Sequence, residues 1–300
     1  MEILEFLQNI RNPFLDNLNL LITNLGSELV VIAVICALYW CVNKKLAYRL
    51  GFVYFISGLA VQTVKLIYKI PRPWVLSEGI QPVDKALEGA TGYSFPSGHT
   101  QSATAFYGTI AYNTKSKGIQ ALMLLIILLV AFSRMYLGVH TPMDVSVSLV
   151  LTLLIIIGCN YAIDRKLIYK LRQEVFTGIL LMIPMAMLVY GTVQVYTGSV
   201  DIENSLDYFK SAGAAVGFIA GWYLETNYLK FDEKQGNTVS KVCRYVLGVA
   251  LLLGLKSGLK VLIGDGIVAG FVRYAITIFF GIYVYPLVFC KVNEKMNNKK

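Results

Sequence analysis

The 300-residue chain has only two histidines, and one of them, His140, lies four residues before an acidic residue, Asp144. In a helix this spacing places the two side chains one turn apart on one face. A carboxylate that accepts one imidazole N–H fixes the tautomer and leaves the other ring nitrogen available as a nucleophile. Arg134, six residues earlier, offers a donor for an anion. Taken alone, such a His–Asp pair is more often a structural hydrogen bond than a catalytic one.

The second histidine follows a helix-start signal, Pro96-Ser97-Gly98-His99. Ser97 suits an N-cap position, and the absence of a side chain at Gly98 lets a ligand come close to the backbone. Free N–H groups at a helix start bind anions, which would place His99 beside a bound anion. The same tetrapeptide is also compatible with an ordinary capped helix start.

A third segment holds two cations, Lys65 and Arg72, seven residues apart at the end of an apolar segment. Two helical turns put them on nearly the same face, and Pro71 and Pro73 then end the helix. Two cations on one face suit an anion with several oxygens, and arginine offers a planar fork for phosphate. The alternative is that both side chains only reach for the membrane interface.

Together the three segments supply three cations, a backbone anion site, one oriented histidine and a second histidine. This set suits phosphoryl transfer without a metal. Metal binding is the competing interpretation, but two histidines, one of them committed to Asp144, make a poor ligand set. We therefore expect no metal and no cofactor.

The elements that must position these residues are transmembrane helices. Hydrophobic residues make up 56% of the chain and charged residues 15%, against about 25% charged in soluble domains. The mean hydropathy is +0.60. The composition predicts an all-α polytopic bundle, because about 20 apolar residues cross a bilayer as a helix. About nine transmembrane spans are expected, with the third packed inside the bundle: 27–42, 50–69, 99–113, 118–137, 142–163, 175–197, 209–229, 242–262 and 267–290.

The sequence divides into three parts. Residues 1–25 carry apolar side chains at helical spacing interrupted by Pro13, which fits an interfacial amphipathic helix and an ordinary packing helix about equally. Residues 26–163 carry the three segments described above. The charged stretch at 164–174 separates them from further spans in 164–300. The five cysteines are interpreted as small buried residues without disulfides.

Basic residues predict the orientation, because short cytoplasmic loops are enriched in Lys and Arg. Seventeen of the 27 basic residues fall in the loops at 43–49, 114–117, 164–174 and 230–244 and in the tail with Lys291, Lys295, Lys299 and Lys300. Nine fall on the opposite face. The tail is therefore expected in the cytoplasm, and the histidine-bearing segments on the outer face.

The three segments resemble the complete signature of the type 2 phosphatidic acid phosphatase superfamily, which includes lipid phosphate phosphatases, glucose-6-phosphatase and vanadium haloperoxidases. Lys65-x6-Arg72-Pro73, Pro96-Ser97-Gly98-His99 and Ser133-Arg134-x5-His140-x3-Asp144 match it in order and spacing, and the resemblance covers roughly residues 50–163. Eleven specified residues agree, which makes coincidence negligible.

The resemblance implies a role for each residue. His140 would attack phosphorus and form a phosphohistidine, with Asp144 orienting it. His99 would protonate the leaving alkoxide and then help activate water. Lys65, Arg72, Arg134, the Ser97 hydroxyl and the Gly98 amide would hold the phosphate oxygens. A bell-shaped pH–rate profile and sensitivity to vanadate are expected.

The predicted function is thus that of an integral-membrane phosphatase, which removes phosphate from a lipid mono- or diphosphate. The reaction is expected at the extracytoplasmic face of a bacterial inner membrane. The lipid bilayer is the expected partner, and no role for nucleic acid is expected. Transfer of the phosphoryl group to another lipid and a non-enzymatic transporter or lipid-binding protein are the alternatives. Three features are secondary. The segment 74–95 could form a lid, a headgroup-selecting loop or a simple connector, and Glu225 is interpreted as a snorkelling or packing residue. Lys256 and Lys260 are interpreted as interfacial cations in preference to groups that draw an anionic lipid toward the site.

Overall fold

The apolar segments fold into helices in this computed structural model, which describes residues 1–167 and 171–297, with side chains up to residue 291. No strand occurs in these ranges, so the predicted all-α class is confirmed. Lys170, Lys299, Lys300 and the side chain of Lys295, which the orientation count includes, lie outside the described residues.

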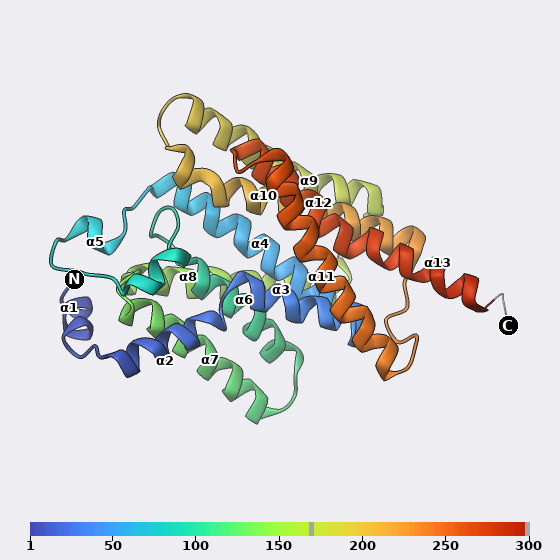
Figure 1. Cartoon of the computed structure of the whole chain (residues 1–300), viewed down its shortest axis with the longest axis horizontal. Coiled ribbons are helices and arrows are strands. Elements are labelled where there is room, and N and C mark those ends of the chain that lie inside the picture. The colour runs from blue at the N-terminus through green and yellow to red at the C-terminus, as the bar shows by residue number, and fades with distance from the viewer. Residues whose placement is uncertain (168–170, 298–300) are drawn as a thin grey trace. The chain divides into compact units, whose positions relative to one another are not determined.

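Figure 1 follows the helices in chain order. They are α1 (Glu2–Asn9), α2 (Pro13–Asn24), α3 (Glu28–Ala37), α4 (Lys44–Tyr68), α5 (Pro73–Leu76), α6 (Gly98–Asn113), α7 (Lys117–Tyr136), α8 (Pro142–Asp164), α9 (Gln173–Tyr196), α10 (Ile202–Leu224), α11 (Thr238–Ile263), α12 (Ile267–Phe279) and α13 (Tyr285–Asn297). Short π-helical segments follow three of them, η1 (Leu38–Val42), η4 (Glu225–Leu229) and η5 (Phe280–Val284), and η2 (Asp84–Gly89) is a 3₁₀ helix.

The chain forms two compact units. Unit 1 comprises residues 1–32, 52–161 and 203–207, and unit 2 comprises 33–51, 162–202 and 208–300. Each unit is described separately below.

Six helical stretches in the described part of the chain are long and apolar enough to cross a membrane, and a seventh is added if the bent pair Pro13–Asn24 and Glu28–Val42 counts as one span. Helices cover all nine predicted segments, but α6 and α10 are not among these candidates. α6 has only 16 residues. α10 is long enough, but small and polar residues lower its hydropathy.

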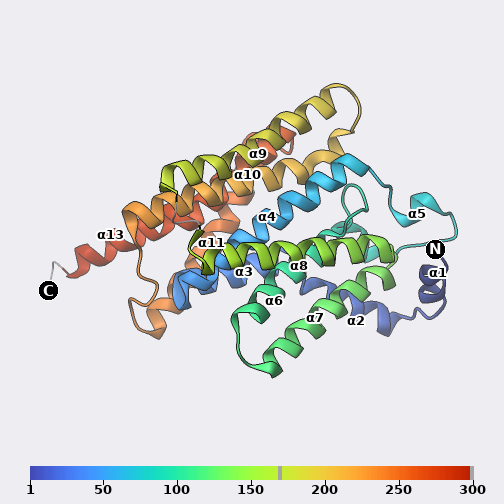
Figure 2. The same ribbon diagram turned by 180° about the vertical axis from the view of Figure 1, so that it is seen from behind.

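Unit 1 has α6 at its centre, as the polar residues of this segment predicted. All ten residues from Thr100 to Thr109 are buried. α6 packs against α7, and Ala105 joins Val53 of α4 and Ile156 of α8 in one apolar cluster. Figure 2 draws the helices α7 and α8 in green. Many of their apolar side chains are exposed, as expected for helices that face lipid.

The N-terminal segment forms two helices because Pro13 begins α2, where the Asn12 side chain accepts a hydrogen bond from Leu15 N at 3.0 Å. The first helix packs onto unit 1: the Gln8 side chain donates to Gly79 O at 3.1 Å and accepts from Gln81 N at 2.8 Å. Phe6, on another side of α1, is 64% exposed. The first helix therefore packs against the protein, as one of the two interpretations predicted. It also keeps an exposed apolar surface, which fits the second interpretation, a helix in the membrane interface.

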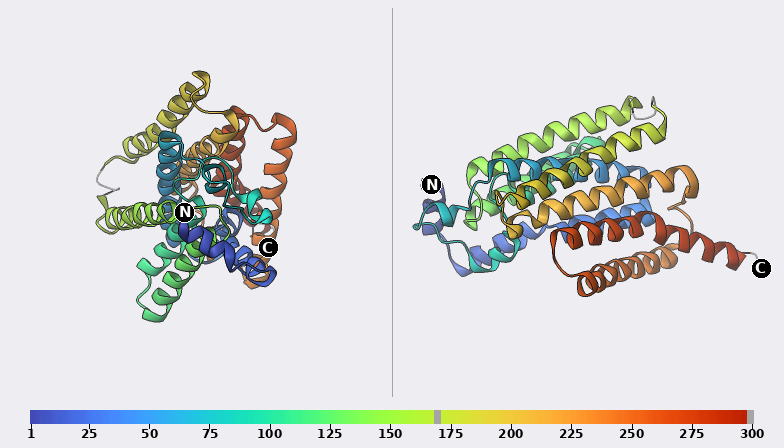
Figure 3. Two further views of the ribbon diagram at one scale, coloured as in Figure 1. Left: turned by 90° about the vertical axis from the view of Figure 1, so that its left-hand side faces the viewer. Right: turned by 90° about the horizontal axis from the view of Figure 1, so that it is seen from above.

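Unit 2 contains α11 beside the run of α12, η5 and α13, as the right-hand view in Figure 3 shows. Small residues of α10 permit close backbone contact, because a Cβ at Gly213 would lie 2.0 Å from the carbonyl oxygen of Phe271 in α12. Glu225 is 1% exposed and accepts hydrogen bonds from Lys44 Nζ at 2.7 Å and from the Tyr48 hydroxyl. Its carboxylate has the packing role that the sequence favoured.

The cations near the other end of α11 are engaged within unit 2. Asp265 pairs with Lys260 at 2.8 Å and with Arg273 at 2.7 Å, in the turn between α11 and α12. Lys256 lies over the ring of Tyr274, with its Nζ 4.8 Å from the centroid. These contacts agree with a local structural use of the three cations.

Candidate active site

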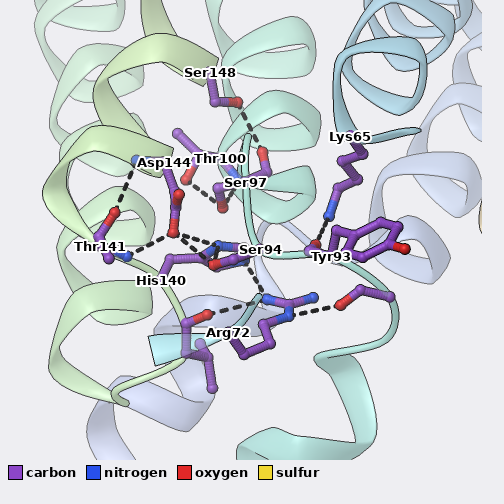
Figure 4. A network of polar contacts seen from close by, with 12 residues as sticks. Lys65, Arg72, Tyr93, Ser94, Ser97, Thr100, His140, Thr141, Asp144 and Ser148 are labelled. Atoms are coloured by element: carbon purple, nitrogen blue, oxygen red, sulfur yellow. Dashed lines mark hydrogen bonds and ion pairs between the residues drawn. The ribbon is translucent and has the colours of Figure 1, made fainter. Parts of the chain in front are cut away.

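The predicted site residues lie in unit 1, where five helices bring them together. Lys65 is in the last turn of α4, Arg72 precedes α5, Ser97 caps α6, Arg134 is in the last turn of α7, and Asp144 is in the first turn of α8. Figure 4 shows five of the predicted residues, Lys65, Arg72, Ser97, His140 and Asp144, in one polar network.

His140 and Asp144 form the pair that their spacing predicted, and both side chains are nearly inaccessible. His140 Nδ1 lies 3.5 Å from Asp144 Oδ2. That carboxylate oxygen also accepts a hydrogen bond from the backbone N–H of Thr141 at 2.7 Å. Asp144 is therefore fixed by the turn that leads into α8.

Arg72 determines the tautomer of this imidazole. Its Nη1 lies 3.0 Å from His140 Nε2, on the side of the ring opposite Asp144. A guanidinium can only donate, so Nε2 must present its lone pair and the ring proton must be on Nδ1. The nitrogen with the lone pair is the one that a nucleophile requires.

Backbone carbonyl groups hold the cations in place. Arg72 donates to Thr91 O at 2.6 Å, Gly92 O at 3.0 Å and Val139 O at 3.0 Å. Lys65 Nζ donates to Tyr93 O at 2.6 Å. Thr91, Gly92 and Tyr93 thus form a strip of three consecutive carbonyls that orients both cations.

Arg134 is 1% exposed and incompletely satisfied. Its Nη1 donates to the hydroxyl of Thr23 in α2 at 2.9 Å. Its Nε and Nη2 are buried and have no hydrogen-bond partner in the described residues. A buried donor without a partner is costly, so these two groups are suited to receive an anion.

The start of α6 has the predicted cap. The Ser97 hydroxyl accepts from Thr100 N at 3.4 Å and from the Thr100 hydroxyl at 3.0 Å, which leaves its own proton as a donor. Space around Gly98 is open, since a Cβ built there meets no atom within 4 Å. His99 lies next to Gly98 in the first turn of α6.

The electrostatics favour neutral His140 and a bound anion. Burial, followed by the charges of Arg72, Arg134 and Lys65, holds the pKa of His140 well below its usual 6.5. None of these three cations forms an ion pair with a carboxylate in the part of the chain that the structure describes. Their positive charge is therefore available to a ligand.

Two groups of site residues were not expected from the sequence. The first is the carbonyl strip 91–93, in the segment considered as a lid or a connector. The second is side chains outside the three motifs, including Ser94, whose hydroxyl donates to Asp144 Oδ2 at 2.6 Å, and Asp207, which accepts from the Thr91 hydroxyl. Among the described residues, no group of three or more His, Cys, Asp or Glu side chains could hold a metal ion.

The sequence also matches known protein families and individual relatives. Residues 46–168 match the family model of the PAP2 superfamily, and residues 209–298 match that of the PAP2 superfamily phosphatase transmembrane extension. Phosphatidylglycerophosphatase B of Bacillus subtilis is 30% identical over 145 residues, covering 45% of this chain and 69% of the relative. Undecaprenyl-diphosphatase BcrC of the same organism is 30% identical, covering 48% and 72%. Human sphingosine-1-phosphate phosphatase 2 is 29% identical, covering 44% of this chain and only 34% of the relative.

Proposed function

Because the chain belongs to the PAP2 superfamily, whose members similar to it are membrane lipid phosphatases, we propose that it hydrolyses a lipid phosphate through a phosphohistidine at His140. The observation that carries this proposal is the group of three buried cations, Lys65, Arg72 and Arg134, which have no carboxylate ion pair in the described residues. Buried cations of this kind are unfavourable without an anion, and a phosphoryl group supplies one.

The first chemical step starts at His140. Its Nε2 lone pair forms a bond to phosphorus while the bond from phosphorus to the lipid oxygen breaks. Protonated His99 gives its proton to that oxygen, so the product is a lipid alcohol, or a lipid monophosphate when the substrate is a diphosphate. Burial and the charges of Arg134, Arg72 and Lys65 hold the pKa of His99 well below 6.5, so its protonated form requires the negative charge of the bound phosphate. The proton on Nδ1 stays in place, and Asp144 stabilises the positive charge that develops on the phosphorylated ring.

The second step regenerates the protein. Neutral His99 takes a proton from water while the water oxygen attacks phosphorus and the N–P bond breaks. Inorganic phosphate leaves and His140 returns to its neutral form. Arg72, Lys65, Arg134, the Ser97 hydroxyl and the Gly98 amide hold the oxygens of the transferring group, where donors stabilise the transition state.

The substrate class is a lipid carrying a terminal phosphate. The three similar proteins are named for a phosphatidylglycerophosphate, an undecaprenyl diphosphate and a sphingosine 1-phosphate. Phosphatidic acid and a lipid A phosphate have the same terminal group and belong in the panel to be tested. We propose hydrolysis at the extracytoplasmic face of a bacterial inner membrane, on the basis of the basic loops that place the tail in the cytoplasm. The division at residues 163 and 164 into a catalytic core and further spans remains a prediction.

The test is phosphate release from a panel of lipid mono- and diphosphates by purified protein in detergent with a chelator present. Wild type should release phosphate from at least one lipid, and His140→Ala should lose all measurable release. Lys85→Gln is the matched control, because Lys85 is an exposed cation of unit 1 outside the polar network. Equal inactivity of wild type and His140→Ala across the panel would contradict the proposal and leave a transporter or binding protein. Label appearing on an added lipid alcohol would instead identify a phosphotransferase.

A further inference from the structure

Between His140 and Asp144 lies a third side chain, that of Ser94, which is outside the three sequence motifs. Ser94 is 1% exposed and belongs to the segment that leads into α6. Its backbone N–H donates to Ile70 O at 2.8 Å, so the main chain at this point is fixed to the end of the α4 segment. A hydroxyl held this rigidly presents its oxygen at a defined place.

The direction of each hydrogen bond at Ser94 follows from its partners. Its Oγ lies 2.6 Å from Asp144 Oδ2, and because an ionised carboxylate only accepts, the serine must donate there. The serine hydroxyl therefore donates its one proton to Asp144 and can only accept a hydrogen bond from any other group. The same Oγ lies 3.4 Å from His140 Nδ1, the nitrogen that carries the ring proton.

The direct contact between His140 and Asp144 is about as long as the contact between His140 and the serine. Nδ1 lies 3.5 Å from the carboxylate oxygen and 3.4 Å from Ser94 Oγ, both near the limit of a hydrogen bond, whereas Ser94 Oγ and the carboxylate are 2.6 Å apart. Arg72 holds the opposite ring nitrogen. The imidazole is thus positioned by a donor on one side and by the serine and carboxylate together on the other.

We propose that Ser94 is a positioning residue for the nucleophile, which orients His140 by linking its Nδ1–H to Asp144 while Arg72 keeps the ring proton on that nitrogen. This inference rests on the proposed function of His140. When Nε2 bonds to phosphorus the ring becomes positively charged and Nδ1–H becomes a stronger donor, so a fixed acceptor stabilises the phosphorylated state. Ser94 contacts neither the substrate nor the reacting atoms in this account.

The experiment uses the fact that the chain has two histidines, so that labelling histidine with ¹⁵N gives ring signals from only two residues. His99→Gln assigns them. In wild type above the pKa of His140, the spectrum should show a proton on Nδ1 and none on Nε2. Ser94→Ala should keep the proton on Nδ1, because Arg72 still donates to Nε2, but the Nδ1–H signal should shift as its hydrogen bond weakens. Its kcat should fall roughly tenfold to hundredfold, as expected for loss of a hydrogen bond to a charged group, with KM within about twofold.

Ser57→Ala is the matched control for removing a buried serine hydroxyl from unit 1. Ser57 is 0% exposed and bonds to Val53 O, Tyr54 O and Gln101, outside the proposed site. It should leave both the Nδ1–H signal and kcat unchanged. An unchanged Nδ1–H signal in Ser94→Ala, with or without loss of activity, overturns the positioning role.

If Ser94→Ala does not fold, the wild-type spectrum still decides, because a proton on Nε2 at neutral pH contradicts the arrangement. The spectra do not depend on turnover. Failure of this inference is therefore separate from failure of the proposed function, which absence of phosphate release by wild type would show.

Discussion

Among the described residues, carboxylate ion pairs hold cations in unit 2 but not at the candidate site in unit 1. In unit 2, Lys44 pairs with Glu225 at 2.7 Å and Arg273 pairs with Asp265 at 2.7 Å. In unit 1, Lys65 and Arg72 are directed by backbone carbonyls, and two donor groups of Arg134 have no partner among the described residues.

The difference separates structural cations from cations arranged for a ligand. A carboxylate or an aromatic ring neutralises or covers a cation permanently, whereas a carbonyl orients it and leaves its net charge in place. Removing a cation from unit 2 should therefore reduce stability, and removing one from unit 1 should reduce activity.

Arg134→Met should have the largest effect on activity. The substitution keeps most of the volume and removes two donors aimed at the phosphoryl group, so kcat/KM should fall about 10²- to 10³-fold. Thermal stability should stay the same or rise, since a buried cation without a counter-ion is lost. Phosphate release and thermal unfolding of the purified protein measure the two effects. A large loss of stability would contradict the distinction.

Lys44→Met in unit 2 should show the reverse behaviour. It leaves the carboxylate of Glu225 buried without its cation, which should lower the free energy of unfolding by about 3 kcal/mol. Activity of the folded protein should be unchanged within about twofold. Adding Glu225→Gln should restore much of the stability, because the unpaired charge is removed. Inactivation as severe as in Arg134→Met would show that the two units are not distinct in this respect.

Two glycines with positive φ extend the comparison to the backbone. Gly92, in the carbonyl strip, has φ +61°, and a Cβ there would lie 3.2 Å from Asn204 O. Gly92→Ala should displace the carbonyl that Arg72 uses and raise KM about tenfold, for a strain of the order of 1–2 kcal/mol. Gly198 in unit 2 has φ +69° with no atom within 4 Å of a built Cβ, so Gly198→Ala should lower stability only. Equal KM values in the two variants would argue against the role of the strip.

The smallest effect is a shift in the pH profile of the residual activity of Arg134→Met. Because burial, Arg72 and Arg134 lower the pKa of His140 below 6.5, neutral His140 should persist below that pH in wild type. Loss of the Arg134 charge removes repulsion from the protonated imidazole, so the pKa of His140 rises. The acid limb of kcat/KM against pH should therefore move to higher pH, and Lys85→Gln should leave it in place. A shift to lower pH would contradict this electrostatic account.

The candidate catalytic side chains could be predicted from the sequence more completely than the backbone and side-chain groups that position them. Side-chain type and helical period are enough to predict several features of the site. They are the pairing of His140 with Asp144, the cap at Ser97 and the cations at 65, 72 and 134. The carbonyl strip 91–93 could not be predicted from the sequence, because every residue has a carbonyl and only the fold determines where it points. Likewise, Arg134 and Thr23 are 111 positions apart, so no local pattern connects them.

The helices show the same division between local and distant information. Apolar segments predicted helices at all nine positions, and polar residues in α6 indicated its buried location. The close approach of Gly213 in α10 to Phe271 could not be predicted, because it depends on the partner helix. The partner of Glu225 could not be read from the sequence either, since Lys44 is 181 positions away.

The central claim is that His140 becomes phosphorylated during turnover. Rapid quenching of the purified protein with a lipid carrying a ³²P-labelled terminal phosphate tests it directly. Label on the wild-type protein should be stable to base, labile to acid and located at residue 140, and His140→Ala should carry none. Equal label in His140→Ala, or an acid-stable label at another residue, would contradict the claim.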